Sequence, residues 1–275
     1  MLSFTLNILK RILLEELILK YRLHITILFA VSLYLISGKN NTPLGLMNIL
    51  SFSLCHFAFH LYNRALDRDS DLISNPSEAL KDYNAVPKLK FSSHIIAICA
   101  VLNSVFWGGS PILIIAFALM AFLYNNLMGI NIKKVFFIKN LYMAIFYAIP
   151  FCLFNTCIFN HQLTLKVYLS FLNYLFTILA IEALWDIKDI EGDRQAGVKT
   201  IANKYGITYT KIYAAILMIV AWCFQYLIYE TIVYYSTFLI LYYLIFLRKN
   251  CSVWNYHLPL LLILIPTLIN LCINI

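Results

Sequence analysis

Long apolar runs separated by short polar segments dominate the chain. Each run is close to the roughly 20 residues that an α-helix needs to cross about 30 Å of hydrocarbon. Nine such runs are predicted, at residues 23–38, 44–62, 93–108, 111–130, 140–158, 165–185, 211–229, 231–247 and 256–274. The pattern therefore predicts an all-α polytopic membrane protein with about nine transmembrane helices, and residues 1–275 are expected to form a single domain.

Residues 1–20 carry lysine, arginine and glutamate among apolar positions. Such a mixture indicates an amphipathic helix lying in the membrane interface. The segment has neither an uninterrupted apolar core nor a small-residue cleavage site, so a secretory signal is not expected.

Composition and charge placement support the membrane prediction. The chain is 62% hydrophobic and only 12% charged, which excludes a water-soluble globule. If the N-terminus is cytoplasmic, 19 of the 21 Lys and Arg residues fall on the cytoplasmic side, leaving Lys39 and Lys166 outside. This asymmetry obeys the positive-inside rule, so the net charge of +8 reflects topology rather than nucleic-acid binding. A plasma membrane or an organelle inner membrane is expected.

Acidic residues gather at the cytoplasmic ends of two apolar runs. Ten of the thirteen Asp and Glu residues lie in segments 63–92 and 182–193. If the second run stays helical through residue 71, the set Asn63, Asp67 and Asp71 lies within about 80° of arc. The second set comprises Glu182, Asp186, Asp189 and Asp193. Steps of four, three and four residues along a helix place these side chains within about 60° of arc.

Two aligned acidic faces at membrane-helix ends indicate a cation site. Charges there are costly unless they are paired, hydrated or bound to metal. Hard divalent cations take oxygen ligands and accept phosphates in the same shell, so the clusters suit Mg²⁺ held against a diphosphate. Acids that merely keep helix ends soluble are the alternative, which explains off-face residues such as Asp69 and Glu191.

The two motifs resemble those of the UbiA superfamily of membrane prenyltransferases. Residues 63–71 read Asn-x-x-x-Asp-x-x-x-Asp, residues 186–193 read Asp-x-x-Asp-x-x-x-Asp, and residues 22–26 are similar to the family's Arg-Pro-x-Thr opening. The resemblance covers nearly the whole chain. It implies a helical bundle enclosing a central cavity, in which Mg²⁺ bridges both motifs to a prenyl diphosphate.

The resemblance also implies roles for individual residues. The implied metal-site residues are Asn63, Asp67, Asp71, Asp186, Asp189 and Asp193, and the four expected to be catalytic are Asp67, Asp71, Asp189 and Asp193. Candidates for contact with the diphosphate, by charge and position, are Arg22, Arg68, Lys188, Arg194, Lys133 and Lys134. A surface salt bridge is the alternative for each basic residue.

The chain departs from the family pattern at three places, one of which is the stretch Ser-Glu-Ala-Leu-Lys-Asp-Tyr that follows Asn75-Pro76. Arg64 stands where the family most often has an acid or amide, and it either contacts diphosphate or an acceptor carboxylate or extends to lipid headgroups. The family's Tyr-x-x-x-Lys element is also altered, because Tyr124 is followed at that spacing by Met128. Either Lys133 or Lys134 replaces the expected lysine, or the contact is absent.

Three further polar residues lie deeper in the same runs. His56, His60 and Glu182 are candidates for an acceptor pocket, where they would orient a hydroxyl group or take its proton. Interhelical hydrogen bonds and buried acid pairing are the alternatives.

The sequence thus predicts a Mg²⁺-dependent enzyme that ionises a prenyl diphosphate and transfers the isoprenyl group to a small acceptor, such as an aromatic one. The lipid bilayer is the third expected partner. A UbiA-type terpene cyclase, in which the cation is captured intramolecularly, remains open. A cation-coupled transporter also remains open because intramembrane acids mark ion paths, although no internal repeat or Gly/Pro-interrupted helix pair is apparent.

Overall fold

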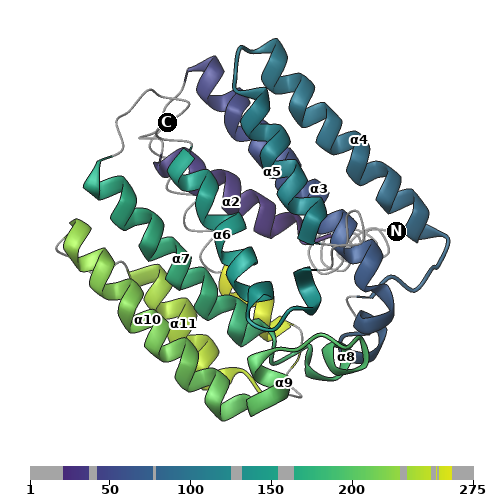
Figure 1. Ribbon diagram of the computed structural model, residues 1–275, viewed down its shortest axis with the longest axis vertical. Coiled ribbons are helices and arrows are strands. Elements are labelled where there is room, and N and C mark those ends of the chain that lie inside the picture. The colour runs from purple at the N-terminus through teal and green to yellow at the C-terminus, as the bar shows by residue number, and fades with distance from the viewer. Residues whose placement is uncertain are drawn as a thin grey trace, which may run out of the picture.

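The computed structural model is a bundle of α-helices (Figure 1). It describes residues 21–36, 42–76, 79–124, 132–153, 164–229, 234–248, 252 and 254–261, and none of these residues lies in a strand. The helices are α2 (Leu23–Ile36), α3 (Pro43–Ser74), α4 (Ala85–Phe106), α5 (Pro111–Tyr124), η2 (Ile132–Lys134), α6 (Ile138–Leu153), α7 (Leu165–Trp185), α8 (Ile190–Gln195), α9 (Ile201–Tyr205), α10 (Ile207–Tyr229) and α11 (Tyr234–Phe246). A further helical segment covers residues 254–261.

The helices agree with the predicted polytopic membrane fold. Within the described ranges, α3, α4, α7 and residues 207–228 of α10 are long and apolar enough to cross a membrane. Shorter apolar helices cover residues 23–34 and 111–124. The predicted interfacial helix at residues 1–20 lies outside the described residues.

Helix α3 carries the first acidic motif beyond its apolar part. Thr42 caps its start by accepting a hydrogen bond from the Gly45 amide at 3.1 Å, and Pro43 occupies the first turn. The helix has 32 residues, so at 1.5 Å per residue it is about 48 Å long and exceeds the hydrocarbon thickness. The expected continuation through residue 71 is therefore found, and Asn63, Asp67 and Asp71 share one helical face.

The second motif does not continue one helix, so the prediction of a single helical ladder through residue 193 is wrong. Helix α7 ends at Trp185, and backbone hydrogen bonds between residues three apart tighten the following turn, including Asp189 N to Asp186 O at 3.2 Å. A new short helix, α8, then carries Asp193. The turn redirects the chain instead of prolonging the α7 face.

Helix packing brings the two motifs to the same end of the bundle. α7 packs against α6 and α10, α3 packs against α4, and α8 packs against α3. Figure 1 shows α8 and α9 at one end of the bundle, beside the last turns of α3 and α7. Two apolar clusters fill the interior, one including Phe52, Phe117 and Phe146 and the other including Leu184 and Tyr243.

Candidate active site

Both acidic motifs line one pocket, although more than a hundred residues separate them in the sequence. The acid and amide side chains that line it are Asn63, Asp67, Asp71, Glu182, Asp186, Asp189 and Asp193. The other lining residues are Arg22, Phe59, His60, Ser70, Ser74, Tyr124, Lys133, Lys139, Met143, Tyr147, Trp185 and Gly192. Six carboxylates thus face three basic side chains, and this excess of negative charge favours a cation.

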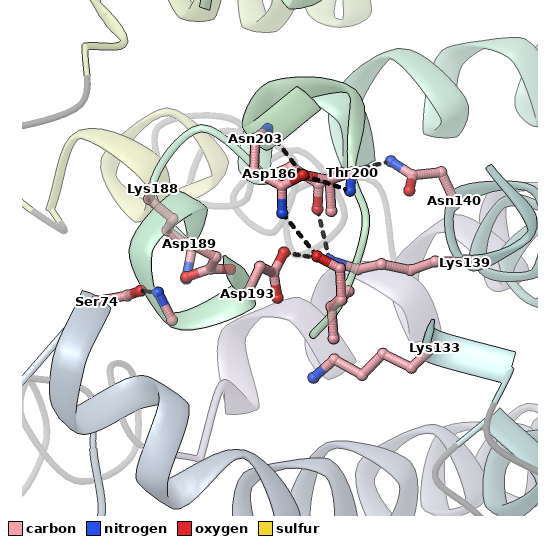
Figure 2. Close-up of polar contacts among 12 residues, drawn as sticks. Ser74, Lys133, Lys139, Asn140, Asp186, Lys188, Asp189, Asp193, Thr200 and Asn203 are labelled. Atoms are coloured by element: carbon pink, nitrogen blue, oxygen red, sulfur yellow. Dashed lines mark hydrogen bonds and ion pairs between the residues drawn. The ribbon is translucent and has the colours of Figure 1, made fainter. Parts of the chain in front are cut away.

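Lys139, at the start of α6, holds the second motif together. Its ammonium group donates hydrogen bonds to Asp186 at 2.7 Å and to Asp193 at 3.0 Å (Figure 2). Asn140 donates to the other Asp186 oxygen at 2.9 Å. The sequence alone places Lys139 only among the 19 basic residues predicted on the cytoplasmic side. Its position directly before a predicted transmembrane run was the signal that could have identified it.

Two other basic residues pair with the first motif. Lys133, from η2, forms an ion pair with Asp67. Arg64 forms a buried ion pair with Asp71, and Arg64 is only 2% exposed. Arg64 therefore points into the protein and does not extend to lipid headgroups.

The end of α3 is tied directly to the second motif. The Asn75 side-chain amide donates to Asp189 at 2.6 Å. The Gly192 backbone amide donates to the Ser74 hydroxyl at 2.6 Å, and Figure 2 shows Ser74 beside the segment that carries Asp189 and Asp193. A Cβ atom on Gly192 would lie 2.5 Å from the carbonyl oxygen of Ser70, so only glycine permits this approach of α8 to α3.

Burial shapes the charge state of Asp193, which lies in α8 outside the membrane-spanning helices. Burial raises the pKa of the Asp193 carboxyl to about 6, although Lys139 favours the charged form. The neighbouring carboxylates of Asp186 and Asp189 act in the same direction as burial. A bound cation would relieve this repulsion.

Only two of the six basic diphosphate candidates, Arg22 and Lys133, line the pocket. Arg68 pairs with Asp69 at 2.6 Å, Arg194 is a largely exposed side chain 3.4 Å from Glu191, and Lys134 is exposed. Lys188 is buried with its ammonium group 3.5 Å from Asp189, but it does not line the pocket.

Of the three deeper candidates, two line the pocket and one does not. His60 and Glu182 line the pocket. His56 does not, since its Nδ1 is hydrogen-bonded to the Thr26 hydroxyl at 3.0 Å and its ring stacks on Phe29. His56 thus makes the interhelical hydrogen bond that was the alternative interpretation.

The sequence pattern of the UbiA prenyltransferase family matches residues 23–258. The chain belongs to this family. The resemblance seen in the two motifs is thereby confirmed, together with the all-α membrane fold. No curated protein matches the chain by sequence.

Solved UbiA structures share this fold. A UbiA homologue from Archaeoglobus fulgidus bound to DMAPP and Mg²⁺ is 15% identical, with a TM-score of 0.64 over 91% of this chain and 95% of that chain. A UbiA homologue from Aeropyrum pernix K1, solved in its apo form, is 14% identical, with a TM-score of 0.61 over 91% and 98%. A digeranylgeranylglyceryl phosphate synthase is 20% identical, with a TM-score of 0.54 over 90% of each chain. At these identities the likeness establishes the fold alone.

The UbiA pocket of this chain has the donor chemistry of a Mg²⁺ site. Carboxylate and amide oxygens are the ligands that Mg²⁺ takes in proteins, and the Asn63 Oδ1 atom is buried without a hydrogen-bond partner. Within the described ranges, no three Asp, Glu, His or Cys side chains converge closely enough to hold an ion as they stand. The carboxylates are instead ion-paired with Lys133, Lys139 and Arg64. Binding of a metal ion would require these ion pairs to rearrange.

Proposed function

We propose that this chain is a Mg²⁺-dependent intramembrane prenyltransferase, formed by residues 1–275 as one domain. It ionises a prenyl diphosphate and transfers the isoprenyl group to a small acceptor. The observation that carries the proposal is the meeting of both acidic motifs in one pocket of a UbiA-family bundle. The Archaeoglobus fulgidus homologue structures, bound to Mg²⁺ with DMAPP or GPP, support the choice of metal and donor.

The residues that would hold Mg²⁺ are Asn63, Asp67, Asp71, Asp186, Asp189 and Asp193. When bound, the metal neutralises charge on the departing diphosphate. Lys133 and Lys139 pair with these carboxylates and line the pocket, so they would be available to contact the diphosphate if Mg²⁺ held the carboxylates. Arg22, which also lines the pocket, would add a third positive charge.

The remaining pocket walls protect the reactive isoprenyl group. The lining side chains Phe59, Met143 and Trp185 are large and apolar, so they exclude water from the pocket. The allylic C–O bond breaks, its electron pair leaves with the diphosphate, and the acceptor attacks the first isoprenyl carbon. Exclusion of water favours transfer over hydrolysis.

The charge distribution supports a cytoplasmic N-terminus and a pocket that opens to the cytoplasm. The motif-bearing end of the bundle also holds Lys133, Lys139 and Lys188, in keeping with the positive-inside rule. Water-soluble diphosphates would then reach the metal site from the side on which they are made. A plasma membrane or an organelle inner membrane fits this orientation.

Diphosphate release from the full chain in lipid nanodiscs tests the proposal. Geranyl diphosphate with Mg²⁺ and a panel of acceptors should yield diphosphate and a prenylated product. Asp67→Asn and Asp189→Asn should each lower the rate by about 10²- to 10³-fold, the effect of losing a main electrostatic contribution to the transition state. Asp69→Asn is the matched control, because that side chain is 84% exposed and lies outside the pocket.

Two outcomes would redirect the proposal. If no pairing of prenyl diphosphate and acceptor releases diphosphate faster than Asp67→Asn, the enzyme function fails. If release proceeds at full rate without acceptor and the product is a cyclised hydrocarbon, the terpene-cyclase alternative replaces transfer.

A further inference from the structure

Three polar side chains from three helices line the same pocket at positions deeper along their helices than the aspartates of the two motifs. They are His60 on α3, Tyr147 on α6 and Glu182 on α7. Each lies four to eight residues along its helix from the charged residue of the same helix that faces the metal site. At 1.5 Å per residue, this places the polar groups about 6–12 Å deeper in the bundle.

Packing fixes the position of His60. Its Nε2 lies 3.4 Å from the Tyr147 hydroxyl, within hydrogen-bond distance. The His56 ring contacts it edge to face at 4.6 Å between centroids, and His56 is itself hydrogen-bonded to Thr26 on α2. Residues on α2, α3 and α6 thus hold the imidazole in place before any ligand enters.

The Glu182 carboxylate is available to bind a ligand group. Among the described residues, the Glu182 carboxylate makes no hydrogen bond or ion pair, and only its backbone carbonyl accepts a bond, from the Asp186 amide. The side chain is partly buried and lines the pocket. Arg22 lines the same pocket with the opposite charge, and its guanidinium lies over the Trp185 ring at 5.6 Å. A carboxylate at this depth in a membrane protein is costly unless a ligand or a paired group offsets it.

The prenyl donor does not account for these groups. Its diphosphate is matched by the ionic end of the pocket, and its hydrocarbon chain can neither donate nor accept a hydrogen bond. A polar ligand group at this depth must therefore belong to the second substrate. The neighbouring aromatic side chains Phe59, Tyr124 and Trp185 offer flat apolar walls to such a ligand.

We propose that His60, Tyr147 and Glu182 form the subsite for an acceptor that carries a hydroxyl group. The inference rests on the proposed prenyltransferase function and deepens it. The acceptor hydroxyl donates to Glu182, while Tyr147 and His60 fix its orientation. As the acceptor bonds to the first isoprenyl carbon, the C–O bond to diphosphate breaks, its electron pair leaves with the diphosphate, and the proton that the acceptor loses passes to the Glu182 carboxylate.

Acceptor dependence is measured with full-length protein in nanodiscs, at fixed geranyl diphosphate and Mg²⁺. 4-Hydroxybenzoate should accelerate diphosphate release and become prenylated, whereas benzoate, which lacks the hydroxyl group, should do neither. Decanol is tested in parallel as an aliphatic alcohol. Product from 4-hydroxybenzoate alone identifies a phenolic acceptor, and product from decanol alone identifies an aliphatic alcohol. If neither hydroxyl compound accelerates release more than benzoate, the subsite proposal is overturned.

Substitutions then locate the subsite with whichever hydroxyl compound is active. Glu182→Gln should raise the acceptor KM about 10-fold or more, because the buried acceptor hydroxyl would lose its charged hydrogen-bond acceptor, the Glu182 carboxylate. Tyr147→Phe should raise it roughly 3- to 10-fold. Glu191→Gln and Tyr142→Phe are the matched controls, since Glu191 lies outside the pocket and the Tyr142 hydroxyl donates to the Met120 carbonyl. Neither control should change the acceptor KM.

Equilibrium binding of geranyl diphosphate with Mg²⁺ separates the two proposals. In Glu182→Gln the donor Kd should stay within about twofold of the unsubstituted chain, while the acceptor KM rises. An unchanged acceptor KM, or an equal loss of donor binding, overturns the acceptor subsite and leaves the prenyltransferase function standing. If Glu182→Gln does not fold, His60→Gln, with exposed His94→Gln as its control, supplies the same comparison. Loss of donor binding and release in the unsubstituted chain would instead overturn the prenyltransferase function.

Discussion

The ammonium group of Lys139 lies 3.0 Å from the Asp193 carboxylate, although 54 residues separate them in the sequence. The same ammonium group contacts Asp186 at 2.7 Å, and Lys139 is only 5% exposed. One side chain at the start of α6 thus joins the end of α7 to α8. In the metal-free protein this lysine supplies part of the positive charge that the second motif requires.

Lys139→Met should destabilise the metal-free protein by about 3–5 kcal/mol, because two buried carboxylates lose their shared counter-ion. Thermal unfolding in detergent, followed with and without Mg²⁺, measures the change. Mg²⁺ should restore part of the loss by binding the same carboxylates. Lys134→Met is the control because Lys134 is exposed. Equal melting temperatures for the two variants would contradict the structural role of Lys139.

Arg64→Met should lower stability by about 3–5 kcal/mol, because it leaves the Asp71 carboxylate buried without this ion pair. Asp71→Asn removes the charge that needs compensation. The double variant Arg64→Met/Asp71→Asn should therefore lose less stability than the sum of the two single variants. Thermal melts of all four proteins give the coupling energy, and strict additivity would show that Arg64 acts through other contacts.

Gly192→Ala should lower stability by about 1–3 kcal/mol, because the added methyl group meets the Ser70 carbonyl and α8 must move away from α3. The same movement displaces Asp193, so the Mg²⁺ concentration for half-maximal activity should rise. Gly108→Ala is the comparison, since a Cβ there meets nothing within 4 Å and strains only a backbone with φ of +69°. A Gly108→Ala protein that loses Mg²⁺ affinity to the same extent would contradict the argument.

Asn63→Leu should raise the Mg²⁺ requirement for diphosphate release by at least about 10-fold, because the unpartnered Oδ1 atom is a proposed metal ligand. Removal of metal with EDTA should abolish release, and added Mg²⁺ should restore it. Asn84→Leu, at an exposed position before α4, should leave the Mg²⁺ titration unchanged. Full activity in EDTA would rule out the metal-dependent reaction.

Mg²⁺ affinity should fall as the pH drops below about 6. The pKa of Asp193 is raised to about 6, so below that pH the carboxyl holds a proton that the metal must displace, and above it the carboxylate is free to bind. Mn²⁺ binding, used as a spectroscopic probe between pH 5 and pH 8, measures the change. Asp193→Asn should flatten the profile over this range. An unchanged slope in that variant would assign the titration to another group.

Much of the architecture follows from the sequence, because helix period and hydrocarbon thickness are local constraints. Runs of about 20 apolar residues require helices, since the backbone must satisfy its own hydrogen bonds in lipid. Helical spacing also places Asn63, Asp67 and Asp71 on one face wherever the helix continues. The family resemblance needed only these motifs in order, and the family match over residues 23–258 agrees with it.

The partners of the acidic residues could not be predicted in this way. The pairing of Lys139 with Asp186 and Asp193, of Lys133 with Asp67, and the turn after Trp185 all depend on contacts between distant segments. Arg68 lies within the first motif and Lys133 lies far from it in the sequence, yet of the two only Lys133 lines the pocket. Spacing along a helix gives the direction of a side chain, but only packing determines what it meets.

The sequence by itself determined a helical membrane protein with two acidic motifs at helix ends, because hydrophobic length and helical period act within each segment. Tertiary structure decided that the motifs share one pocket and that three basic residues form ion pairs with the carboxylates. It also decided that His60, Tyr147 and Glu182 line the same pocket deeper in the bundle. These relationships arise from the packing of α3, α6, α7 and α8, in which the hydrogen bond between Gly192 and Ser74, for example, joins residues 118 positions apart.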